Sequence, residues 1–201
     1  MCGRYYMDID DKEIKKIADE AEKNIYQDYS TGEIFPSDVA PILVSGQQGP
    51  RPILAKWGFP KWDGKGIIIN ARLESAEEKQ MFKNLVSSGR CIVPASAYFE
   101  WKKEEASKTK YIIHRDNSIL YMAGLYTAVQ HEHRQMSIFE QRDTDICYTI
   151  ITRDASPSVS FIHNRMPLIF DSSGAKDYLN GRSMDNLLEI SAISLLSRAV
   201  R

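Results

Sequence analysis

The first four residues of the chain, Met1-Cys2-Gly3-Arg4, have the most reactive chemistry in the sequence. Removal of Met1 would leave Cys2 with an amine and a thiol on adjacent carbons. An α-amine has a pKa of about 8 and a thiol one of about 8.5, so an uncharged amine and some thiolate are both accessible near neutral pH. Such an aminothiol captures an aldehyde as an imine, which the thiol then closes to a thiazolidine. The alternative is a disordered terminus in which Cys2 is incidental.

Glu100 and His163 are the candidates for proton transfer. Glu100 lies in an aromatic extended segment, in which Tyr98 and Glu100 share one face while Phe99 and Trp101 share the other. Burial there would raise the pKa of Glu100 toward the range that suits a general acid or base; an exposed edge-strand glutamate is the alternative. His163 should end a helical turn opened by Ser156-Pro157, a position that favours a protonated imidazole. A structural, hydrogen-bonding histidine is the alternative.

Asn70, Arg72 and Arg165 are candidates for holding a phosphate or a sugar. Asn70 and Arg72 lie where an apolar strand gives way to an expected helix, a junction at which backbone amides favour anions. The alternative is that Asn70 caps a turn and Arg72 pairs with Glu74 or Glu78. Arg165 follows His163 closely and is expected to be free to meet a phosphate.

Two tryptophans, Trp57 and Trp62, flank a Gly58-Phe59-Pro60 turn and lie among cationic residues. Stacking of a base on such a ring contributes about 1–3 kcal/mol, and nearby lysines would track the phosphates of a single strand. Core burial is the competing interpretation, although the turn makes burial of both rings doubtful.

The composition describes an ordinary globular protein. The chain has 201 residues and a mass of 22.9 kDa, which fits one domain over residues 1–201. The net charge of −1 gives no global attraction to nucleic acid, so any DNA contact must be local. No apolar run reaches the ~18 residues of a membrane helix, and no secretory signal is evident. The three cysteines are an odd number and lack paired spacing, which favours a reducing compartment, so we expect the cytosol.

The elements that must position these residues are short strands and a few helices. Apolar spacing predicts a helix over 11–21, and a capping box at Ser75 and Glu78 predicts another that ends at Gly89. Short helices are expected at 175–179 and 184–190, the second capped by Ser183. A hairpin turn is expected at Asp116-Asn117. Strands are expected at 41–44, 53–59, 67–69, 90–94, 97–102, 111–115, 119–129 and 146–152. This order favours an α+β fold with mainly antiparallel sheet.

Together these segments resemble the SRAP family, the SOS-response-associated peptidase-like proteins that crosslink to abasic sites in single-stranded DNA. The resemblance spans most of the chain and rests on motifs whose order is specific. These are Met1-Cys2-Gly3-Arg4, Trp57-Gly58 through Trp62, Asn70-Ala71-Arg72-x-Glu74, Arg90-Cys91-Ile92-Val93-Pro94, Phe99-Glu100-Trp101, Ala123-Gly124-Leu125, Ile150-Ile151-Thr152 and Ile162-His163-Asn164-Arg165-Met166-Pro167.

The resemblance implies a role for each candidate. Cys2 would be the nucleophile, Asn70 would position the reacting sugar or Cys2, and Glu100 and His163 would handle protons. Arg4, Arg72 and Arg165 would hold phosphates, with Trp57, Trp62 and Trp101 as further DNA-binding residues. The family also implies a curved antiparallel sheet, close to a barrel and flanked by helices.

The resemblance also implies that these residues converge on one groove, and two departures from the family pattern concern the shape of that groove. Ala95-Ser96-Ala97-Tyr98 lacks a glycine that the family loop often has, and Tyr126 stands where tryptophan is usual. Residues 130–145 form a variable segment with no assigned role, and His131-Glu132-His133 within it is expected to be a solvated loop rather than a metal site.

The sequence therefore predicts a monomeric protein of the bacterial cytosol or nucleoid. We expect it to capture the ring-opened aldehyde of an abasic site covalently, through lyase-like chemistry without metal or organic cofactor. One alternative is a cysteine peptidase limited to removal of Met1, with His163 as base. The other is a noncovalent reader of modified or single-stranded DNA.

Overall fold

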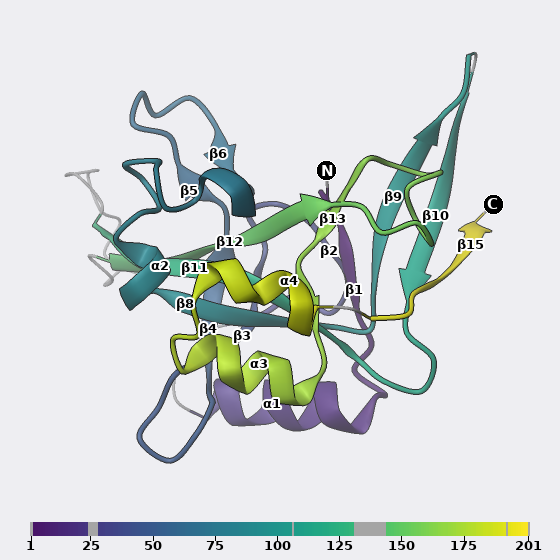
Figure 1. Ribbon diagram of the computed structural model, residues 1–201. Coiled ribbons are helices and arrows are strands. Elements are labelled where there is room, and N and C mark those ends of the chain that lie inside the picture. Colours follow the sequence, from purple (N-terminus) through teal and green to yellow (C-terminus); the bar gives the residue numbers. More distant parts are fainter. Residues whose placement is uncertain (1, 24–27, 106, 131–143, 192, 201) are drawn as a thin grey trace.

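The computed structural model describes residues 2–23, 28–105, 107–130, 144–191 and 193–200. Two sheets make up most of it (Figure 1). The first is an antiparallel sheet of five strands, in which the long β9–β10 hairpin and β15 lie on one side of the molecule. Its strands, in spatial order, are β15 (Leu196–Val200), β10 (Lys108–His114), β9 (Ala97–Lys103), β1 (Tyr5–Met7) and β2 (Gly32–Ile34).

The second sheet closes on itself. Its central strands pair in the ring β12–β4–β3–β8–β11–β12, and only the β12–β4 pair of this ring is parallel. These strands are β12 (Thr144–Asp154), β4 (Arg51–Trp57), β3 (Val39–Val44), β8 (Arg90–Ala95) and β11 (Leu120–Gln130). The α+β fold with a barrel-like, mainly antiparallel core is therefore confirmed.

Short strands extend the ring toward the candidate residues. β7 (Asn70–Arg72) pairs parallel with β12, and β13 (Arg165–Pro167) pairs antiparallel with the end of the same strand. β14 (Ile169–Phe170) pairs with β11, while β5 (Phe59–Pro60) and β6 (Ile67–Ile68) form a separate two-stranded sheet. β12 therefore lies between the segments that carry Asn70 and Arg165.

The predicted first helix is confirmed as α1 (Lys12–Glu22), whose apolar residues are buried against β3 and β4. The Asp11 carboxylate begins this helix by accepting from the backbone N–H groups of Glu13 and Ile14 at 2.8 and 3.0 Å. α3 (Ser172–Leu179) is capped in the same way by Asp171 and packs on β8 and β11. Helices thus flank the barrel, as Figure 1 shows.

The long helix predicted after Ser75 is wrong. The chain forms a 3-10 turn (Leu73–Ser75), further turns, and only a four-residue helix, α2 (Leu85–Ser88). Phe82 is buried and its ring lies 6.2 Å from that of Phe59 in β5. This tertiary packing, rather than the capping box, determines the path of the segment.

Two smaller expectations also need correction. Asn117 adopts a positive φ of 50°, as a turn residue can, but β10 and β11 on either side belong to different sheets, so no hairpin forms. Ser183 precedes a 3-10 helix (Met184–Asn186) and α4 (Leu187–Ile190), but its side chain makes no capping hydrogen bond.

Replacement of Asp11 by alanine tests the first helix. We expect Asp11→Ala to lower the free energy of unfolding by about 1 kcal/mol, since two helix N–H groups lose their acceptor. Asp10→Ala is the matched control, because Asp10 is exposed and caps nothing, and it should change stability by no more than ~0.5 kcal/mol. Urea unfolding of both variants measures the difference, and equal losses would contradict the cap.

Candidate active site

Cys2 is held inside the protein by the first strand. The Phe99 backbone N–H donates to the Arg4 carbonyl at 2.9 Å, and Tyr5 pairs with Tyr98 across β1 and β9. Cys2 has an exposed fraction of 0% and its Sγ lies 3.8 Å from the Arg4 carbonyl oxygen. The N-terminal residues therefore run along β9 rather than into solvent, and the interpretation of a disordered start is wrong.

Glu100 is buried on the same strand. Its exposed fraction is 4%, so the alternative of an exposed edge-strand glutamate is wrong. Tyr98, two residues earlier, has an exposed fraction of 0% and lies on the same face of β9. A carboxyl group and a phenol therefore point to one side of the strand that Cys2 follows.

The charges of these groups act on one another. Burial raises the pKa of the Cys2 thiol well above its usual range, and the nearby Glu100 carboxylate raises it further. Burial is also the main cause of the raised pKa of Tyr98, to which the charges of Cys2 and Glu100 add. Cys2, Tyr98 and Glu100 therefore lie within electrostatic range, and both the thiol and the phenol hold their protons near neutral pH.

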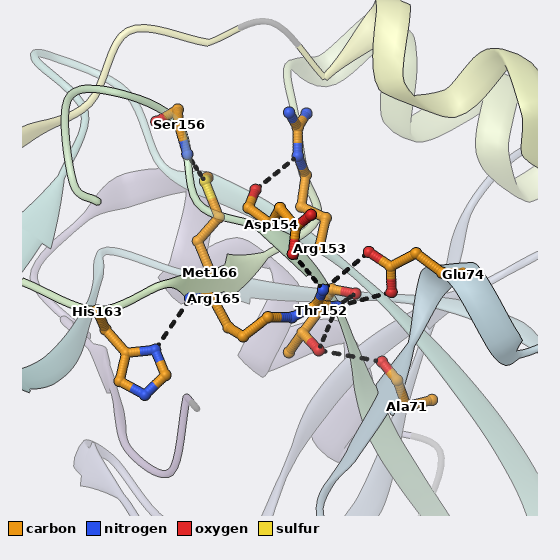
Figure 2. Close-up of polar contacts among 9 residues, drawn as sticks. All are labelled: Ala71, Glu74, Thr152, Arg153, Asp154, Ser156, His163, Arg165 and Met166. Atoms are coloured by element: carbon orange, nitrogen blue, oxygen red, sulfur yellow. Dashed lines mark hydrogen bonds and ion pairs between the residues drawn. The ribbon is translucent and has the colours of Figure 1, made fainter.

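His163 is fixed by a backbone donor. Its Nδ1 accepts from the Arg165 N–H at 2.9 Å, so Nδ1 carries no proton (Figure 2). This contact fixes the orientation of the His163 ring. The turn opened by Ser156 forms, with Ser160 N–H donating to its carbonyl at 2.9 Å, but no regular helix follows.

Arg165 is not free to meet a phosphate. Its guanidinium donates to both Glu74 carboxylate oxygens at 2.8 and 2.9 Å, to Asp154 at 2.7 Å and to the Thr152 carbonyl at 2.7 Å (Figure 2). The Arg165 side chain is only 11% exposed. Its hydrogen bonds are the main cause of the lowered pKa of Glu74. Glu74 is thus paired with Arg165, so of the two partners considered for Arg72, Glu74 and Glu78, the first is already engaged.

Asn70 and Arg72 lie side by side with β12, opposite Ile150 and Thr152. Both polar atoms of the Asn70 amide are buried without a hydrogen-bond partner among the described residues, so this side chain caps no turn. Arg72 is exposed. A three-residue 3-10 turn follows them, so the expected anion site at an α-helix terminus is wrong.

The two tryptophans have different environments. Trp57 is fully buried, its Nε1–H donates to the Ile69 carbonyl at 3.1 Å, and its ring stacks on Tyr148 at a centroid distance of 6.3 Å. It cannot stack on a base, so its assignment as a DNA-binding residue is wrong. Trp62 is 95% exposed beside the two-stranded β5–β6 sheet and remains a candidate.

Arg4 and Trp101 meet on the other face of the five-stranded sheet. The Arg4 guanidinium lies 5.1 Å from the Trp101 ring centroid and 4.2 Å from that of Phe35, and it donates to Glu33 at 2.9 Å. Lys110 stacks on Phe99 in the same cluster. The predicted division of β9 into a Tyr98–Glu100 face and a Phe99–Trp101 face is confirmed.

One aromatic contact connects Glu100 with the segment before His163. Tyr111 lies directly opposite Glu100 across β9 and β10, so their side chains share a face. The Tyr111 ring meets the ring of Phe161 edge to face at 5.8 Å, two residues before His163. No sequence motif assigns a role to Tyr98 or Tyr111, although the alternation along β9 that places Glu100 on one face places Tyr98 on the same face.

Other kinds of site are not found among the described residues. No group of three or more His, Cys, Asp or Glu side chains there is arranged to hold a metal ion. Within the same parts of the chain, no helix is long and apolar enough to cross a membrane. His131-Glu132-His133 lies outside the described residues.

Cysteine alkylation tests the electrostatic contact between Glu100 and Cys2. Removal of the carboxylate charge in Glu100→Gln should lower the pKa of the Cys2 thiol and so speed its alkylation at fixed pH. Cys91 is an internal control, because burial is the cause of its raised pKa. Mass spectrometry of each cysteine in one sample gives both rates. An unchanged ratio of Cys2 to Cys91 alkylation would contradict the contact.

Known proteins share both the sequence and the fold. The chain is 30% identical over 189 residues to Abasic site processing protein YedK of Escherichia coli, covering 89% of this chain and 79% of the relative. It is 34% identical over 199 residues to Abasic site processing protein YoaM of Bacillus subtilis, covering 91% and 81%. A crystal structure of a Bacteroides thetaiotaomicron protein has a TM-score of 0.80 at 25% identity, covering 100% of this chain and 92% of that one.

The family comparison agrees with these relatives. The model of the SOS response associated peptidase (SRAP) family matches residues 1–198, which include every candidate residue described above. The chain belongs to the SRAP family.

Proposed function

We propose that this protein binds single-stranded DNA at an abasic site and captures the ring-opened aldehyde on Cys2 after Met1 is removed. The observation that carries the proposal is the burial of Cys2 beside Glu100 in a chain whose relatives are named abasic site processing proteins. Removal of Met1 supplies the free amine that the aminothiol reaction requires.

The first step is addition of the Cys2 amine to C1′ of the open sugar. The C–N bond forms, the C=O π pair moves to oxygen, and the nitrogen proton is transferred to that oxygen. Loss of water then gives the imine. A buried carboxylate within range of Cys2 suits the transfer of these protons, and so we assign Glu100 to it.

The second step is addition of the thiol to the imine. The S–H proton goes to nitrogen as the S–C bond forms, which closes the thiazolidine. The raised pKa of Cys2 supports this order, because a thiol that keeps its proton is a poor first nucleophile while the amine is free to attack.

His163 would assist through Nε2, since its Nδ1 is occupied by the Arg165 N–H. An imidazole held in a fixed orientation can donate a proton or a hydrogen bond from Nε2 to a sugar oxygen. We assign it to opening of the deoxyribose ring, with Asn70 holding the sugar through its unpartnered amide.

The DNA strand would be bound by exposed groups. Arg72 is exposed beside Asn70, and Trp62 offers an accessible ring for a base. Arg4 and Trp101 lie on the opposite face of β9 from Glu100, so we expect them to contact the strand away from the reacting nucleotide. A monomer working in the cytosol or nucleoid is sufficient for this reaction.

Crosslinking to an oligonucleotide with one abasic site tests the proposal. Cys2→Ala and Cys2→Ser should abolish the adduct on a denaturing gel, since an adduct of this kind needs amine and thiol on one residue. Cys147→Ala should leave it intact. Normal crosslinking by a chain with an uncleavable residue ahead of Cys2 would refute the aminothiol mechanism, and binding without any adduct would favour a noncovalent reader.

Glu100 and His163 are expected to affect rate rather than extent. A positioned acid or base contributes ~10²–10⁴-fold, so Glu100→Gln and His163→Ala should slow adduct formation by this range while the yield recovers at long times. Slowing by His163→Ala should be milder on an aldehyde that is already open. Equal binding of the oligonucleotide is checked first, and unchanged rates on both substrates would remove the two residues from the mechanism.

A further inference from the structure

The hydroxyl of Tyr98 is a buried polar group whose position in the core is unexplained by packing. Its atoms have an exposed fraction of 0%, and the hydroxyl oxygen has no hydrogen-bond partner among the described residues. A phenylalanine would fill the same volume without burying an unsatisfied hydroxyl, which is unfavourable. The hydroxyl therefore lowers the free energy of unfolding of the ligand-free protein. A hydrogen bond from this hydroxyl to bound DNA would explain why a tyrosine lies here.

The surroundings of this hydroxyl are those of the reacting centre. Tyr98 lies two residues from Glu100 on the same face of β9, and its electrostatic neighbours are Glu100 and Cys2. Across the strand pairs it faces Tyr5 of β1 and Ile113 of β10, neither of which offers it a hydrogen bond. It is thus a donor with no internal acceptor, beside the nucleophile.

We propose that Tyr98 is a further catalytic residue, whose hydroxyl donates a hydrogen bond to the aldehyde oxygen of the abasic sugar while the Cys2 amine attacks C1′. This inference rests on the proposed function. As the C–N bond forms, the C=O π pair moves to that oxygen, which takes its proton from the attacking nitrogen. Tyr98 keeps its own proton throughout and stabilises the developing negative charge, as donors of an oxyanion hole do.

Its raised pKa suits this role. Burial, with the charges of Cys2 and Glu100, keeps the phenol protonated at the pH of the reaction. Tyr98 is then a hydrogen-bond donor near neutral pH, and it does not compete with Glu100 for the transferred proton.

Tyr98→Phe and a matched control separate catalysis from packing. Tyr178 has a buried hydroxyl that donates to the Gly124 carbonyl at 2.8 Å, so Tyr178→Phe removes a satisfied hydroxyl instead. We expect Tyr98→Phe to slow crosslinking by about 10- to 100-fold, the range between an ordinary hydrogen bond and an oxyanion-hole donor, with an unchanged or higher Tm. Tyr178→Phe should show the reverse, a lower Tm and a normal rate.

A comparison of closed and ring-opened abasic sugars distinguishes the role of Tyr98 from that of a residue that opens the ring. Because the hydroxyl acts on addition to the aldehyde, Tyr98→Phe should be slowed equally on closed and already open abasic sugars. A wild-type rate for Tyr98→Phe, or a loss of Tm as large as that of Tyr178→Phe, would overturn the role of Tyr98 and leave the proposed function standing. Failure of the wild-type protein to form any adduct would overturn the proposed function as well.

Discussion

The anchoring of the first strand is the constraint on which the site depends. β1 has three residues, yet Tyr5 within it connects the two sheets: its backbone pairs with β9, while its ring lies 5.3 Å from Trp57 and its hydroxyl 2.7 Å from that of Tyr148. Trp57 and Tyr148 belong to the barrel. Tyr5 is held by β9 on one side and by the barrel on the other, so the residues before it follow β9. Cys2 is therefore buried close to Glu100.

Arg165 is the second anchor, and it acts through two different parts of one residue. Its guanidinium joins Glu74 to Asp154, while its backbone N–H fixes the ring of His163 (Figure 2). A phosphate at this guanidinium would compete with the two carboxylates that already bind its terminal nitrogens. Arg165 therefore positions His163 and the end of β12.

The sequence predicted well which residues share a face of a strand or a helix, and it predicted poorly which distant residues are in contact. Alternation along 97–102 placed Tyr98 and Glu100 on one face, and the spacing of apolar residues located α1, since both patterns depend on local geometry alone. The short strands β1, β2 and β15 carry no local pattern, because pairing with distant segments creates them. The same reason explains two wrong predictions, a free Arg165 and a DNA-binding Trp57. Arg165 pairs with Glu74, 91 residues away, and Trp57 is buried by distant segments, and neither contact can be inferred from local spacing.

Unsatisfied polar groups explain why a site of this kind is recognisable only in the folded protein. Asn70 and Tyr98 reach the interior from β7 and β9, in separate sheets, and each lacks a partner among the described residues. A buried polar group without a partner costs about 1–3 kcal/mol, whereas most of the buried residues here are apolar. The folding energy of the barrel and of the β1 anchor offsets that cost. Donors held rigid in advance need no reorganisation when charge develops on a substrate, so the buried amide of Asn70 and hydroxyl of Tyr98, which weaken the fold, meet the main requirement of the proposed chemistry.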